Sequence, residues 1–213
     1  MGPRNQIEVD LEAIGKIFTG KCIMITGAAG SIGSEIVRQV ASFKPSQMIL
    51  IDQAETPLHD IRLMMMHKFA DIPALTLTAS ISHKCHMEAV FKEYKPDYVF
   101  HAAAYKHVPM MEDNPGEAVV NNIDGTRIIA DLAVKYKTKK FVMVSTDKAV
   151  NPTNVMGCSK RICEMYCQSL NKAIADGVVK GCTQFVTTRF GNVLGSNGSV
   201  IPIFKDDVGN PFH

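Results

Sequence analysis

The sequence predicts an α/β protein: a doubly wound parallel sheet of about six strands with helices on both faces. Short apolar runs recur along the chain, and each is followed by a longer stretch that can be helical. The runs are continuously apolar, which is typical of strands covered on both faces. A glycine-rich turn leads directly from the first run into the first helical stretch. This alternation predicts parallel strands joined by right-handed crossovers.

The elements can be assigned in order along the chain. The expected strands are KCIMIT (21–26), QMILID (47–52), ALTLTA (74–79), DYVFHA (97–102), KFVMVS (140–145) and CTQFVTTR (182–189). The expected helices between them are residues 31–43, 54–70, 84–94, about 113–137 and 156–176. No repeat or low-complexity linker interrupts the alternation, so we expect a single domain.

Composition excludes several classes of protein. Hydrophobic residues make up 46% of the 213 residues, which is enough for a sizeable core. The 23 Lys and Arg nearly balance the 21 Asp and Glu, which argues against a nucleic-acid surface. The six cysteines form no CxxC pair, so we expect reduced structural thiols rather than a metal site or disulfides. No apolar run approaches the roughly 20 residues of a membrane helix, and the N-terminus is too polar for a secretory signal. A cytoplasmic location is expected.

The stretch ITGAAGSIGSEIV is a GxxGxxG variant of the dinucleotide-binding fingerprint. Gly27 permits a tight turn, Gly30 lets backbone approach a pyrophosphate, and Gly33 lets the helix pack close to the strand. The phosphates would lie at the helix N-terminus, and Ser31 or Ser34 could cap the helix or contact them. An ordinary glycine turn is the alternative, but here a strand precedes the turn and a helix follows it.

An acidic residue at the end of the second strand supports the same interpretation. Asp52 is placed to accept hydrogen bonds from a ribose diol. The next residues are Gln53 and Ala54, so no arginine is available for a 2′-phosphate. The sequence therefore predicts a Rossmann-type domain that binds NAD rather than NADP.

Polar clusters follow the later strands, where ligands gather in an open α/β sheet. They are His101–Ala104, Ser145–Lys148 and Arg189–Asn192. The small residues of HAAA would let a cofactor lie against the backbone. Helix capping by Ser or Asp is the structural alternative for the second cluster, but capping accounts for one polar residue per turn and not for Ser-Thr-Asp-Lys.

Four long motifs carry a family resemblance. TGAAGSIGSEI, HAAAYKHVPMMEDNPGEAVVNNIDGT, VSTDKAVNPTNVMGCSKR and RFGNVLGSNGSVIPIF resemble, in this order, the extended short-chain dehydrogenase/reductase superfamily. Within it, the chain closely resembles the nucleotide-sugar 4,6-dehydratases of the CapD-like polysaccharide biosynthesis family, over residues 7–204. The resemblance implies NAD-dependent dehydration of a UDP-N-acetylhexosamine, usually UDP-N-acetylglucosamine, to a 4-keto-6-deoxy sugar nucleotide used in capsule and glycan biosynthesis.

The resemblance also implies the catalytic residues, with one departure. Most of the superfamily uses Tyr-x-x-x-Lys, but this chain has Met156 where the tyrosine stands and keeps Lys160. A thioether cannot accept a proton, so the candidates become Thr146, Asp147 and Lys148, which the methionine-bearing branch of the family also carries.

The chemistry suggests a role for each of these side chains. Asp147 would act as acid and base at the C4 hydroxyl, the C6 hydroxyl or both, and Lys148 as the base at C5, although the two roles can be exchanged. Thr146 would hydrogen-bond the sugar, Lys160 would bind the nicotinamide ribose, and Met156 would pack near the nicotinamide. The alternatives are a turn or cap for Asp147 and solvated surface charge for the lysines.

Further contacts follow from the matched motifs. The residues expected to contact NAD are Gly27, Gly30, Ser31, Ile32, Gly33, Asp52, Gln53, Ser80, Ile81, Ala102, Ala103, Ala104, Asn121 and Lys160. The residues expected to contact the UDP-sugar are Lys106, His107 and Asn192. The two histidines, His101 and His107, are more often structural or cofactor-adjacent than catalytic.

The chain also departs from the family at two places. Ser80 stands where an aspartate facing the adenine is expected. Family members continue beyond this chain, so we expect a leader over residues 1–20, the NAD-binding domain over 21–204, and a truncated tail over 205–213 with the substrate domain largely missing. The membrane segment of longer relatives is not present, and pairing of two copies through the helices at 84–94 and 113–137 is possible.

Two other functions remain open. A nucleotide-sugar 4-epimerase or reductase could use the same scaffold, although epimerisation at C4 needs no base at C5. A catalytically silent NAD-binding fragment is the second, which Ser80 and the early terminus favour.

Overall fold

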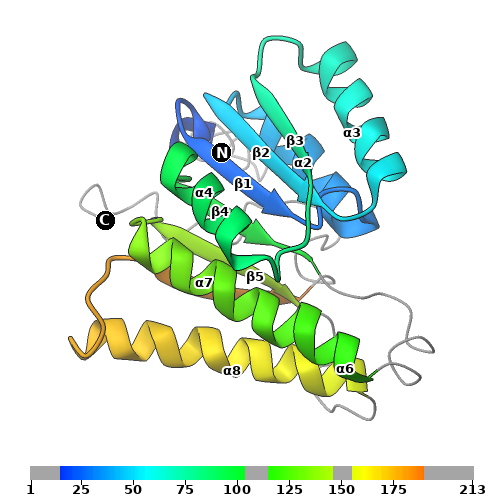
Figure 1. The fold of residues 1–213 in the computed structure, drawn as a ribbon. Coiled ribbons are helices and arrows are strands. Elements are labelled where there is room, and N and C mark those ends of the chain that lie inside the picture. Colours follow the sequence, from blue (N-terminus) through cyan, green and yellow to red (C-terminus); the bar gives the residue numbers. More distant parts are fainter. Residues whose placement is uncertain (1–14, 104–114, 146–154, 190–213) are drawn as a thin grey trace, which may run out of the picture.

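The computed structural model describes residues 15–103, 115–145 and 155–189 (Figure 1). Its six strands form one parallel sheet with the spatial order β3-β2-β1-β4-β5-β6, so the predicted fold class is confirmed. The strands are β1 Cys22–Thr26, β2 Gln47–Asp52, β3 Ala74–Thr78, β4 Tyr98–His101, β5 Lys140–Ser145 and β6 Gln184–Arg189. The order reverses between β1 and β4, which is where doubly wound sheets bind ligands.

Helices cover both faces of this sheet. They are α2 Ser31–Ser42, α3 Glu55–Lys68, α4 Lys84–Tyr94, α6 Pro115–Ala118, the π-helix η1 Val119–Asp124, α7 Gly125–Lys135 and α8 Val155–Ala175. Within the described residues, none of the helices has both the length and the apolarity needed to cross a membrane.

Two apolar cores lie on the two faces of the sheet. Ile25, Leu50 and Phe100 face α2 and α3, whereas Met24 and Phe141 face the layer of α4, α7 and α8. All five side chains are fully buried. Successive residues of β1 thus enter opposite cores, which is why the strand sequences are continuously apolar.

A helical turn at residues 15–18 packs onto the first core. Phe18 is fully buried, and its ring centroid lies 5.6 Å from that of Phe43 and 5.7 Å from that of Tyr98. The end of the expected leader segment is therefore part of the folded domain.

One predicted helix differs in kind from expectation. Residues 113–137 were expected to form a continuous α-helix, but the described part consists of α6, the six-residue π-helix η1 and α7. The residue types of a π-helical turn are those of the α-helix around it, so its apolar composition alone did not reveal it.

The sixth strand begins at Gln184, two residues after its expected start at Cys182. The buried Thr183 hydroxyl instead donates to the carbonyl of Ala133, at 3.3 Å, on α7.

The glycine-rich turn brings α2 into backbone contact with β1. Gly27 has φ +67°, a left-handed conformation that favours glycine. A Cβ on Gly33 would lie 1.9 Å from the carbonyl oxygen of Gly27. No side chain fits between helix and strand at this point, which fixes the distance between the two elements.

A buried histidine links three elements beneath the carboxyl edge of the sheet. His101, at the end of β4, is fully buried. Its Nδ1 lies 2.7 Å from Oγ1 of Thr26 on β1, and its Nε2 lies 2.9 Å from Oγ1 of Thr126 on α7. Burial, together with the charge of Lys160, lowers the pKa of His101 to about 3. The imidazole is therefore neutral at physiological pH.

We expect Gly33→Ala to lower the free energy of unfolding by about 1–3 kcal/mol or more, because the added methyl group overlaps backbone atoms. Gly116→Ala in α6 is the matched control, since a Cβ there meets no atom within 4 Å. Thermal unfolding followed by circular dichroism measures both variants. Equal melting temperatures for the two would contradict the close approach of α2 to β1.

The buried histidine predicts a pH dependence of stability. The pKa of His101 in the folded state is about 3, below the usual value of about 6.5. Between these two pH values the unfolded state therefore binds more protons than the folded state. We expect stability to fall with decreasing pH by up to about 1.4 kcal/mol per unit from this group, and His101→Gln to flatten the slope between about pH 6.5 and 5. Urea unfolding at several pH values across this range measures the free energy of unfolding and hence its slope against pH. His59→Gln, the same substitution at an exposed position of α3, is the control; identical slopes in the two variants would exclude His101 as the cause.

Candidate dinucleotide-binding and catalytic site

The N-terminus of α2 opens at the carboxyl edge of the sheet. Gly30 is the N-cap residue, no side chain of the described residues caps the helix, and its first turn has no acidic residue. Ser31 is exposed at the first helical position, whereas the Ser34 hydroxyl donates to the carbonyl of Ser31 at 3.2 Å. Of the two predicted serines, only Ser31 faces solvent. An uncapped helix N-terminus of this kind favours an anion such as a pyrophosphate.

Asp52 is held beside this turn by two backbone donors. The amide of Ala29 donates to Oδ2 at 3.0 Å, and the amide of Ala54 donates to Oδ1 at 2.9 Å. The carboxylate thus has a fixed orientation and stays half-exposed, with lone pairs available for further hydrogen bonds. Gln53 is exposed next to it. This geometry suits two hydroxyl groups of a ribose.

The loop after β3 forms the neighbouring part of the edge. The Ser80 side chain accepts a hydrogen bond from the amide of Ser82, at 3.2 Å, which closes a local turn. Ile81 is buried, and a Cβ on Gly125 would lie 2.6 Å from its side chain. The Ser82 hydroxyl donates to the carbonyl of Val120 in η1, at 3.1 Å. The loop is therefore anchored to the helix that follows β4.

The end of β4 lies directly against the glycine-rich turn. A Cβ on Gly27 would lie 2.7 Å from the carbonyl atoms of Ala102 and from the amide nitrogen of Ala103. Both alanines are half-buried. At the reversal point of the sheet, backbone and small side chains line the surface, so a flat ligand could approach closely.

Lys160, on α8, is buried next to the carboxyl end of β5. Only 7% of the residue is exposed, and Nζ lies 3.5 Å from the carbonyl oxygen of Val144. Its charge is close enough to contribute to the lowered pKa of His101. The alternative of a solvated surface charge is therefore wrong for Lys160. A buried ammonium at the carboxyl edge is suited to hold an anionic or hydroxyl-bearing ligand.

Three residues next to Lys160 were not singled out in the sequence. The Asn122 side-chain amide donates to the Ser159 hydroxyl at 2.8 Å, and the Cys163 thiol donates to the main-chain carbonyl of Asn122. Asn122 is buried, and its Oδ1 has no partner among the described residues. The pair Asn121-Asn122 was a visible signal in the sequence, but the π-helical turn in which Asn122 is buried was not.

Several predicted site residues cannot be placed. Met156 lies in the first turn of α8 and Asn121 lies in η1, but their side chains are not described. The residues that fall outside the described ranges are Ala104, Lys106, His107, Thr146, Asp147, Lys148 and Asn192. The last described residue of β5 is Ser145, so the Thr-Asp-Lys cluster directly follows the carboxyl end of that strand.

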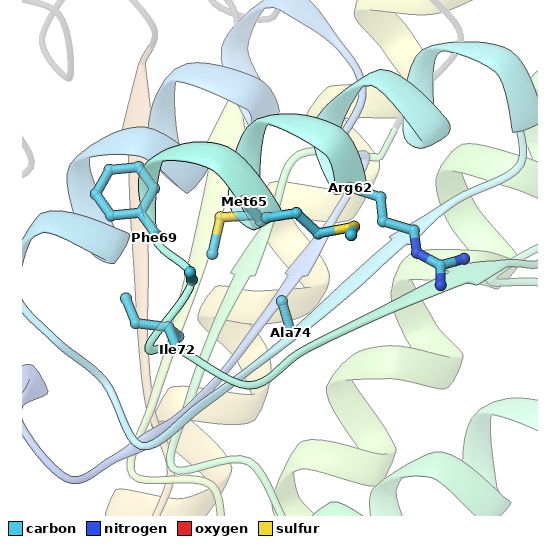
Figure 2. Close-up of a pocket in the computed structure, with 7 residues that line it drawn as sticks. Arg62, Met65, Phe69, Ile72 and Ala74 are labelled. Carbon is cyan, nitrogen blue, oxygen red and sulfur yellow. The ribbon is translucent and has the colours of Figure 1, made fainter.

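A groove elsewhere on the surface does not belong to this site. It has a volume of about 210 Å³ and lies between the C-terminal half of α3 and the start of β3 (Figure 2). Met65, Phe69, Ile72 and Ala74 line it together with Arg62. Ala74 is the first residue of β3, so the groove lies at the amino end of that strand, away from the carboxyl edge.

No group of three metal-ligating side chains occurs in the part of the chain that the structure describes. The cysteine sulfurs there are not disulfide-bonded.

Comparison with known proteins identifies relatives of this chain. The chain is 48% identical to the capsular polysaccharide biosynthesis protein CapD of Staphylococcus aureus over 206 residues, which cover 96% of this chain and 33% of CapD. It is 33% identical to the UDP-N-acetylglucosamine 4,6-dehydratase (inverting) of Campylobacter jejuni over 191 residues, which cover 89% of this chain and 54% of the dehydratase. The chain thus spans a third of the length of CapD and about half of that of the dehydratase.

Solved structures show the same relationship. Pen from Bacillus thuringiensis matches with a TM-score of 0.71 and 34% identity, covering 91% of this chain and 57% of Pen. UDP-glucose 4-epimerase of Thermotoga maritima, solved with UDP-glucose, matches with a TM-score of 0.66 and 25% identity, covering 79% of this chain and 54% of the epimerase. The sequence profile of the family described as "Polysaccharide biosynthesis protein" matches residues 23–211. The chain therefore belongs to this polysaccharide biosynthesis protein family.

Proposed function

We propose that this chain is the NAD-binding and catalytic part of a nucleotide-sugar 4,6-dehydratase that acts on a UDP-N-acetylhexosamine. The observation that carries the proposal is the burial of Lys160 at the carboxyl edge, next to a dinucleotide-type turn. The similarity to a UDP-N-acetylglucosamine 4,6-dehydratase supports the choice of reaction and substrate.

The described residues fit NAD on steric and electrostatic grounds. Gly27 and Gly33 let β1, α2 and the end of β4 meet in backbone contact, which fixes the glycine-rich turn where Gly30 would let a pyrophosphate approach the backbone. The uncapped N-terminus of α2 would stabilise the negative charge of the pyrophosphate. The oriented carboxylate of Asp52 would accept hydrogen bonds from the hydroxyl groups of the adenosine ribose. Ser80 would face the adenine without a charge. The half-buried Ala102 and Ala103 would line the side of the nicotinamide.

NAD, when bound, supplies a hydride acceptor for C4 of the sugar and a hydride donor for C6. The chain's own groups would move the protons. Asp147 would take the proton of the C4 hydroxyl and protonate the departing C6 hydroxyl, and Lys148 would remove the C5 proton, which the neighbouring ketone acidifies. Lys160 would hold the nicotinamide ribose, because its amino group is buried at the carboxyl edge and can donate hydrogen bonds. Met156 has no proton to offer, so none of these steps uses it.

A 4-epimerase is the second candidate. It is favoured by the similarity to UDP-glucose 4-epimerase, which was solved with UDP-glucose. Epimerisation inverts C4 and leaves the composition of the sugar unchanged, whereas dehydration removes one water. The mass of the product therefore distinguishes the two reactions.

We expect Asp52→Asn to weaken NAD binding on the order of ten- to hundredfold, because a hydrogen bond to a charged group contributes about 1.5–3 kcal/mol. Isothermal titration with NAD and with NADP measures the effect. Wild-type chain should prefer NAD, and the variant should lose much of that preference. Asp60→Asn on the exposed side of α3 is the control. Equal affinity of wild type and Asp52→Asn for NAD would exclude the ribose contact.

We expect the chain to convert UDP-N-acetylglucosamine, in the presence of NAD, to a product lighter by one water. Mass spectrometry of the reaction mixture measures this directly. A product of unchanged mass but altered configuration would favour the epimerase. Unreacted substrate, together with tight NAD binding, would favour a catalytically silent domain.

The same assay tests the two proton-transferring residues. Asp147→Asn and Lys148→Met should each abolish the loss of water. Asp71→Asn and Lys92→Met make the same chemical changes at exposed positions and should leave turnover unchanged. Full turnover in either site variant would remove that residue from the mechanism.

A further inference from the structure

The π-helix η1 lies between the two ends of the proposed cofactor site. On one side, the Ser82 hydroxyl donates to the carbonyl of Val120 from the loop that holds Ser80. On the other side, the Cys163 thiol donates to the carbonyl of Asn122 from α8, the helix that carries Lys160. Two carbonyls of one short segment thus accept hydrogen bonds from side chains of two different elements.

The geometry of a π-helix explains why these carbonyls need outside donors. Such a turn forms hydrogen bonds with a longer spacing than an α-helix and is commonly a single interruption in a longer helix. A buried carbonyl in it needs a partner from a side chain or water, which applies to Asn122, whereas the bond from Ser82 to Val120 lies at the exposed surface. Asn122 is buried, and burial raises the pKa of the Cys163 thiol, which keeps its donor proton. The Thr126 hydroxyl, which lies 2.9 Å from Nε2 of His101, partly counteracts this rise in the pKa of the Cys163 thiol.

Packing and a further hydrogen bond hold η1 against the Ser80 loop on one side and against α8 on the other. Ile81 fills the space where Gly125 has no side chain, directly after η1. The Asn122 amide reaches the Ser159 hydroxyl at 2.8 Å, one residue before Lys160. A shift of η1 would therefore displace both the loop at Ser80 and the first turns of α8.

We propose that Ser82 and Cys163 are positioning residues that tether η1 from opposite sides and so fix the spacing between the adenine end and the nicotinamide end of the site. This inference rests on the proposed binding of NAD. Neither side chain contacts the cofactor in this proposal: each acts through a main-chain carbonyl of η1.

Hydrogen exchange of the chain without cofactor tests the tethers directly. Ser82→Ala and Cys163→Ala should each increase exchange of the amides of residues 119–124. Cys167→Ala is the matched control, because this thiol is fully buried one turn further along α8 and makes no hydrogen bond to η1 among the described residues. Cys163→Ser keeps a donor and should restore protection. Unchanged exchange in both tether variants would overturn the proposal.

NAD affinity gives a second measurement, which separates the loss of a tether from a general loss of packing in α8. Each tether variant should bind NAD about three- to tenfold more weakly, the loss expected from one neutral hydrogen bond. Cys163→Ser should recover most of the affinity, and Cys167→Ala should match wild type. The double variant should lose less than the product of the two single losses, because both tethers act on one segment.

The outcomes separate the tethers from the proposed function. Losses that multiply independently would exclude a common segment and overturn the tether proposal. Wild-type chain that binds no NAD would count against the proposed function, while the exchange measurement still decides the tethers. Normal NAD binding without turnover would count against the dehydratase reaction alone.

Discussion

The backbone contact between Gly33 and Gly27 is the constraint on which the rest of the site depends. It sets the height of α2 above the sheet, and with it the position of the helix N-terminus. The same turn brings β1 against the end of β4 and lets the Ala29 amide orient Asp52. A separation larger by one methyl group would move the N-terminus of α2 and the carboxylate of Asp52 apart, so the distance between these two groups follows from the absence of two side chains.

Lys160 and His101 are both buried beneath the carboxyl edge of the sheet. Burial and the charge of Lys160 keep His101 neutral, and its two ring nitrogens lie within hydrogen-bonding distance of the hydroxyls of Thr26 and Thr126. A neutral imidazole avoids repulsion with the ammonium in a region of low dielectric. The main-chain carbonyl of Val144 further offsets the desolvation of Lys160. The polar layer under the site therefore places an uncharged imidazole, and not an imidazolium, near Lys160.

The parts of the fold that composition controls were predictable. Continuous apolar runs such as those of β1 and β5 identify strands covered on both sides, and the parallel arrangement follows from the helices between them. The glycine spacing and Asp52 likewise indicated the dinucleotide-type turn before any coordinates were known. These features are local in sequence, so a pattern can report them. The spatial order of the strands agreed with the doubly wound class, which has few alternatives.

Features that depend on tertiary contacts were not predictable. Thr26, Asn122 and Cys163 are ordinary strand or helix residues in the sequence, and only packing makes them polar contacts of the site.

The π-helical turn also depends on tertiary contacts, and it changes the rotational phase of the helix. Each α-helical residue turns the chain by about 100°, so one extra residue rotates everything on its N-terminal side against everything that follows. The faces that α6 and α7 present are thereby decoupled, and the length of residues 119–124, as well as their chemistry, becomes a constraint on the fold.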